Sequence, residues 1–78
     1  MDWQADLVVN MRLTRTRSPY GSPALDYRNS CTYRITCIGG HFTQTLISGN
    51  PQMSTDGNDG QVISVSVTGF TWQNFELL

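Results

Sequence analysis

The 78 residues carry a formal net charge of −1; only 14% of them are charged, and about a third are Ser, Thr, Asn or Gln. A chain of this length forms one small domain whose core is marginal without a disulfide, a metal or a second subunit. The low charge argues against a strongly basic nucleic-acid module and favours a protein that packs against other protein.

The hydropathy pattern argues against two further classes. No apolar run approaches the ~20 residues that a membrane helix needs, and residues 1–6 carry no secretory-signal pattern. The chain has two alanines and no long 3.6-residue periodicity, so it predicts no major helix.

The first predicted strand begins at Asp6, after a short lead-in whose Trp3 is expected to cover one end of the core. Its apolar face carries Leu7, Val9, Met11 and Leu13. The alternation continues far enough that we expect the strand to project beyond the sheet at its Arg15–Arg17 end. The segment from Ser18 to Ser30 contains two prolines and a glycine, and it is predicted to be either an extended loop or a ragged hairpin arm.

The stretch from Cys31 to Ser48 predicts the central hairpin. Two runs rich in β-branched and aromatic residues flank the Gly39-Gly40 pair, a pattern typical of a two-residue β-turn. The implied cross-strand pairs on the apolar face are Cys37 with Phe42, Ile35 with Gln44, and Tyr33 with Leu46. The opposite face then carries Thr32, Arg34, Thr36, Ile38, His41, Thr43, Thr45 and Ile47.

A second loop is predicted over residues 49–60, where Asp56-Gly57 and Asp59-Gly60 are strong turn dipeptides. The alternating run after it places Ile63, Val65 and Val67 inward, with Gly69 marking a bulge or bend. Residues 70–78 are expected to form either a fifth strand or an amphipathic tail that docks.

These elements predict a single all-β domain over residues 1–78. We expect a small antiparallel sheet or barrel of four to five strands, built around the central two-residue hairpin.

The two cysteines are predicted to be reduced. Cys31 and Cys37 lie six residues apart on one predicted strand, so their Cα atoms would be roughly 20 Å apart, against the 4.4–6.8 Å or so that a disulfide requires. Pairing of Cys31 between chains stays open. Reduced thiols fit a cytoplasmic or intravirion setting.

No catalytic, cofactor or metal site is predicted. His41 is the single histidine and points away from Cys37, and no CxxC or HExxH spacing occurs. Asp56, Asn58 and Gly60 imitate the first half of a calcium loop, but turn chemistry explains these residues without a metal.

Positive charge is concentrated within residues 12–34, which carry +4 while the flanks carry −5. Arginines interleaved with tyrosines can neutralise phosphates and stack unpaired bases. The candidate residues for a nucleic acid or a partner are Arg12, Arg15, Arg17, Tyr20, Tyr27, Arg28 and Arg34. In layout, although not in sequence, this segment resembles the small single-stranded-DNA-binding proteins of filamentous phages.

The favoured function is therefore a non-enzymatic assembly or protein-interaction subunit that acts through the sheet surface and edges. We expect a homo-oligomer or a larger protein assembly, with Trp72, Phe75 and Leu77 in the interface. Small size, the absence of lysine and polar β character suggest a viral or phage origin. The alternative is a single-strand nucleic-acid-binding protein, and an inhibitor of a larger machine is a third possibility.

Overall fold

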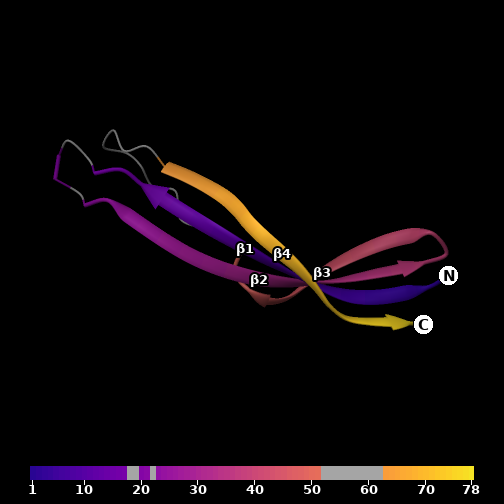
Figure 1. The fold of residues 1–78 in the computed structure, drawn as a ribbon. Coiled ribbons are helices and arrows are strands. Elements are labelled where there is room, and N and C mark those ends of the chain that lie inside the picture. Colours follow the sequence, from indigo (N-terminus) through magenta and orange to yellow (C-terminus); the bar gives the residue numbers. More distant parts are fainter. Residues whose placement is uncertain (18–19, 22, 52–62) are drawn as a thin grey trace.

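The chain forms one antiparallel sheet of four strands. The computed structural model describes residues 1–17, 20–21, 23–51 and 63–78. The strands are β1 (Trp3–Arg15), β2 (Leu25–Ile38), β3 (His41–Gly49) and β4 (Ile63–Leu77). Their order in the sheet is β3-β2-β1-β4, and every neighbouring pair is antiparallel (Figure 1). The sheet is open, with β3 and β4 as its edges.

The hairpin of β2 and β3 confirms the predicted diglycine turn. Gly39 and Gly40 have φ angles of 58° and 79°, the left-handed pair that a type I′ turn needs and that glycine adopts without strain. The three predicted cross-strand pairs on the apolar face are all present: Cys37 with Phe42, Ile35 with Gln44, and Tyr33 with Leu46.

Strand β1 lies between β2 and β4 and pairs with both of them. Its predicted apolar face is confirmed, since Leu7 and Leu13 lie opposite Tyr33 and Tyr27 of β2. The expected projection at the Arg15–Arg17 end was wrong. Arg15 is the last residue of β1, and it is paired with Leu25 of β2 on one side and with Ile63 of β4 on the other.

Strand β2 begins six residues earlier than the predicted hairpin. Of the two alternatives predicted for the segment from Ser18 to Ser30, the hairpin arm is confirmed for residues 25–30, which pair with Asn10–Arg15. Both prolines of that segment precede Leu25, so every residue of β2 keeps its backbone N–H donor. The turn residues predicted at Asp56-Gly57 and Asp59-Gly60, and the calcium-like spacing among them, lie outside the described residues.

Strand β4 contains both the predicted last strand and the residues that were expected to form a fifth strand or a tail. Two register shifts against β1 interrupt it. At the first, Asn10 faces Gly69 and Met11 faces Val67, which leaves Thr68 as an extra residue and confirms the bulge predicted at Gly69. At the second, between the partners of Gln4 and Asp6, Asn74 has a positive φ of 53°. Each bulge reverses which side chains face which side of the sheet.

The sheet is long, twisted and single-layered in the described part of the chain (Figure 1). Its extents are 55 × 18 × 15 Å, and its radius of gyration of 17.0 Å exceeds the ~11.5 Å expected of a compact domain of this length. The buried apolar side chains lie along the two inner strands. They are Ala5, Met11, Leu13, Cys31 and Cys37. The strands therefore bury a narrow strip, and none of the residues that the structure describes forms a second layer over it.

Gly49 provides a test of this packing. Its φ is 84°, and a Cβ at this position would lie 2.4 Å from the carbonyl oxygen of Ser30 and 2.7 Å from the Cα of Cys31. We expect Gly49→Ala to lower the free energy of unfolding by about 1–3 kcal/mol from backbone strain alone, with the clash adding to it.

The matched control is Gly69→Ala, where a Cβ meets no atom within 4 Å and φ is not positive. We expect that control to stay within about 0.5 kcal/mol of the wild type. Urea unfolding at one fixed protein concentration measures both, and equal midpoints for the two variants would contradict the close approach at Gly49.

Candidate protein-interaction surface

One side of the sheet, here called the apolar face, collects almost all the large apolar side chains. The register and the two bulges place Trp3, Ala5, Leu7, Val9, Met11, Leu13, Tyr27, Cys31, Tyr33, Ile35, Cys37, Phe42, Leu46, Val65, Val67, Phe70, Trp72, Phe75 and Leu77 on it. Among the described residues that the register places there, Arg15 alone carries a charge, and it lies at one end of the ribbon.

The apolar face is exposed at both edge strands. Phe42 on β3 is 68% exposed, and Val67, Phe70 and Phe75 on β4 are each 63–64% exposed. Each edge strand has one neighbour, and no described residue lies over the face. A run of large exposed apolar side chains along one face marks an interaction site, whereas scattered single ones would not.

Four aromatic rings from three strands gather at the end of the ribbon where the chain begins and ends. Trp3 is their centre: its ring centroid lies 5.9 Å from that of Phe42, 6.3 Å from that of Trp72 and 5.8 Å from that of Phe75. The contacts with Phe42 and Trp72 are edge-to-face, a geometry worth about 0.5–1.5 kcal/mol per pair. Trp3, Trp72 and Phe75, together with the small Ala5, line an open hollow of about 220 Å³.

The opposite side, here called the polar face, is organised by Asp6. Its carboxylate accepts a hydrogen bond from Nδ2 of Asn74 at 3.0 Å and one from Nε of Arg34 at 3.1 Å. These two bonds use both carboxylate oxygens, and they hold the pKa of Asp6 below its usual value, the Asn74 bond having the larger effect. The Asp6 side chain is only 8% exposed, and a buried charge needs hydrogen-bond partners. Arg34 supplies one of them, and Asn74 at the second bulge of β4 supplies the other.

A second ion pair lies on the polar face. Arg12 holds Asp26 in a two-point contact, with Nε 2.8 Å from Oδ1, which raises the pKa of the guanidinium and lowers that of the carboxyl. Gln4 links Thr36 of β2 to Glu76 of β4 across β1. The face is therefore hydrophilic and locally neutralised.

The structure divides the predicted arginine–tyrosine residues between both faces. Arg12 and Arg28 lie directly opposite each other on β1 and β2, whereas Arg34 lies farther along β2 beside Asp6. The register places Arg15 and Tyr27 on the apolar face. Arg17 and Tyr20 lie between β1 and β2. Only Arg12 and Arg28 are thus brought together on adjacent strands.

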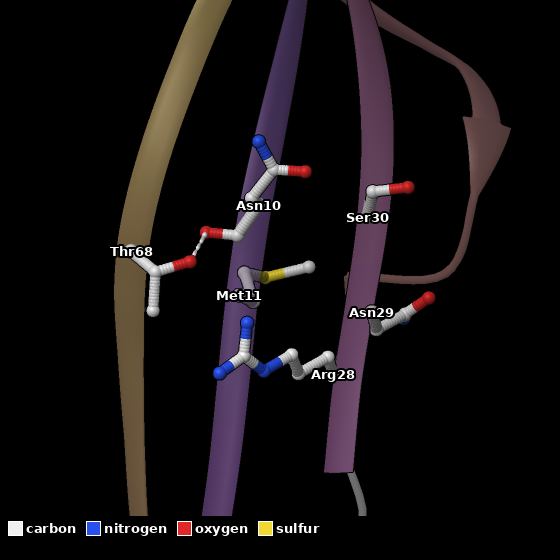
Figure 2. Close-up of a pocket in the computed structure, with 6 residues that line it drawn as sticks. All are labelled: Asn10, Met11, Arg28, Asn29, Ser30 and Thr68. Atoms are coloured by element: carbon white, nitrogen blue, oxygen red, sulfur yellow. Dashed lines mark hydrogen bonds between the residues drawn. The ribbon is translucent and has the colours of Figure 1, made fainter.

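Arg28 borders an open hollow of about 530 Å³ (Figure 2). Its other lining residues are Asn10, Met11, Asn29, Ser30 and Thr68. Figure 2 shows the guanidinium of Arg28 reaching across β1, while Oγ1 of Thr68 donates to the carbonyl oxygen of Asn10 at 3.4 Å. One cation among neutral amides and hydroxyls can hold a small anion, but it does not form the charged track that a nucleic-acid strand follows.

Cys31 lies opposite Val9, and Cys37 lies opposite Trp3, six residues farther along β2. The predicted separation of the two thiols is therefore confirmed. Both are buried and free. The described residues contain no cluster of three or more His, Cys, Asp or Glu able to hold a metal, and His41 is exposed beside the diglycine turn. The described part also contains no helix long and apolar enough to cross a membrane.

The predicted interface residues Trp72, Phe75 and Leu77 lie on the apolar face, but the sequence interpretation missed Phe42, Val67 and Phe70. The signal for Val67 and Phe70 was present in β4 as apolar residues three positions apart, at 67 and 70 and again at 72 and 75. That spacing breaks a two-residue period once, as a one-residue bulge does. Searches of known families, curated proteins and solved structures found no match to this chain.

The contacts of Asp6 predict an acid-sensitive contribution to stability. Its folded-state pKa lies below the value near 3.8 of the unfolded chain, so this contribution is present above about pH 4 and is lost as the pH falls through the folded-state pKa. In Asp6→Asn, which does not ionise, we expect the free energy of unfolding to decline less steeply than in the wild type between about pH 5 and pH 2.

Asp26→Asn is the control, because the Asp26 side chain is 51% exposed and solvent screens its ion pair. That variant should keep most of the wild-type acid dependence. An Asp6→Asn curve parallel to the wild-type curve would contradict the role assigned to Asp6.

The division of the arginines predicts the result of a nucleic-acid test. Because Arg12 and Arg34 already contact carboxylates, we expect no salt-dependent binding of labelled single-stranded oligonucleotides in fluorescence anisotropy. Binding whose logarithm falls with the logarithm of salt, at roughly −0.7 per neutralised phosphate, and which Arg28→Ala weakens, would instead support the nucleic-acid alternative.

Proposed function

We propose that this protein is a non-enzymatic subunit of a protein assembly and that it binds protein through its apolar face. The observation that supports this proposal is the surface area. The chain exposes 5492 Å², whereas a compact monomer of 8.7 kDa exposes about 4,700 Å². The excess of about 800 Å² equals the share that each partner contributes to an interface of standard size.

The architecture supports the same proposal. Stable domains bury the apolar side of a sheet under a second layer, either another sheet or a set of helices. The four described strands form one layer, which supports a partner as the source of the second layer. The edge-strand side chains of Phe42 and Phe70 are the ones that such a layer would cover most.

The sheet edges are a weaker candidate for the main contact. An edge strand can accept another strand through its unpaired backbone groups, but bulges disturb this pairing. Strand β4 contains two bulges, and the β2–β3 register shifts between Thr32 and Tyr33. We therefore assign the main contact to the face and leave the edges a secondary role.

The proposed setting is a reducing compartment, either cytoplasmic or intravirion. A free and buried Cys31 supports it, because this thiol would have no partner for a disulfide within the chain. A viral or phage assembly is the proposed context, which rests on small size, absence of lysine and β composition.

Site-specific photo-crosslinking, carried out in the cells in which the protein naturally occurs, tests this function. Phe70 and Thr71 are adjacent, both exposed, and lie on opposite faces of β4. With p-benzoylphenylalanine at position 70, we expect covalent protein adducts after irradiation, because the apolar face would be covered. The same probe at position 71 is the control and should give few adducts.

The mass of each adduct identifies its partner, whether another copy of the chain or a different protein. No adduct at position 70, or equal yields at both positions, would contradict a protein-binding role for the apolar face.

A further inference from the structure

We infer that the partner on the apolar face is a second copy of this chain, and that the two sheets pack face to face around a two-fold axis as a β-sandwich. This inference rests on the proposed function and names the partner of the same surface. Two excesses of about 800 Å² make an interface of about 1,600 Å² in total, which is the size of a standard stable interface.

The distribution of charge favours an identical partner. An interface between two copies brings each surface against itself, so a strongly charged face would repel its copy. The register places no charged described residue on the apolar face except Arg15, near the end of β1. The ion pairs of Asp6 with Arg34 and of Arg12 with Asp26 lie on the other side, away from the contact.

Shape supports the same occupant. The apolar face belongs to a twisted ribbon 55 Å long, so its partner has to offer an apolar surface of similar length and matching twist. A second copy has the same right-handed strand twist, and sheets of like twist stack about 10 Å apart at a small angle. The centre of the sheet, where Val9 pairs with Cys31, then lies near the two-fold axis.

The mass of the purified wild-type protein is the first test. Light scattering coupled to gel filtration should give about 17 kDa at micromolar concentrations, twice the 8.7 kDa of one chain. A monomer at every concentration would overturn the inference, and so would a species larger than two chains, since one apolar face covers only one other. A monomer together with Phe70 adducts of another mass would leave the proposed function standing.

Two charge insertions on neighbouring residues locate the contact. Phe70→Arg places a cation on the apolar face, and Thr71→Arg places one on the polar face of the same strand. We expect Phe70→Arg to raise the dimer dissociation constant by roughly 30-fold or more and Thr71→Arg to leave it nearly unchanged. A dimer that survives Phe70→Arg, or one that only Thr71→Arg disrupts, would overturn the face-to-face arrangement.

Acrylamide quenching of tryptophan fluorescence, measured together with circular dichroism, distinguishes loss of the dimer from loss of folding. Trp72 is 51% exposed in the single chain and would be covered in the dimer. The wild type and Thr71→Arg should therefore be quenched less than Phe70→Arg, while far-ultraviolet circular dichroism of all three shows the same strand content. Equal quenching of the wild type and Phe70→Arg, with the sheet intact in both, would overturn the inference.

Discussion

The structure depends on keeping apolar side chains on one face along four strands of 9 to 15 residues. A strand alternates strictly, so one misplaced residue would turn everything beyond it to the wrong side. Strand β4 avoids this error with two one-residue bulges, after Val67 and after Gln73. Val67, Phe70 and Phe75 consequently share a face, although their spacing in the sequence does not follow a two-residue period.

The same arrangement leaves the apolar side of the described strands without cover. Separating apolar from polar side chains yields a stable domain when something covers the apolar side, and the described strands supply no second layer. The inner strands gain cover from their neighbours, which is why Leu13 and Cys31 are buried, whereas Phe42 and Phe70 on the edges are not. The length of the ribbon and its excess surface are two consequences of this missing layer.

The parts of the fold that local chemistry determines could be predicted from the sequence. Gly39-Gly40 defines its own turn, and the turn defines the register of Cys37 with Phe42. The last strand could not be predicted as one element, because Asn74 adopts a left-handed conformation only where its amide reaches Asp6, 68 residues away. The positions of the arginines could not be predicted for a similar reason, because closeness in the sequence does not determine which face of the sheet each one occupies.

Because charges pair with one another on the polar face, binding of a partner would depend on shape and burial more than on charge. Long-range attraction of a partner needs a surface potential that the chain has not already neutralised. The carboxylate of Asp6 binds Arg34 and that of Asp26 binds Arg12, so four of the nine charged side chains in the described part of the chain pair on one face. In the proposed assembly, the attraction for a partner comes from the apolar face, where covering the exposed rings removes them from water. A sheet built this way would bind a surface that matches its length and twist, and the second copy that we infer as its partner meets both conditions.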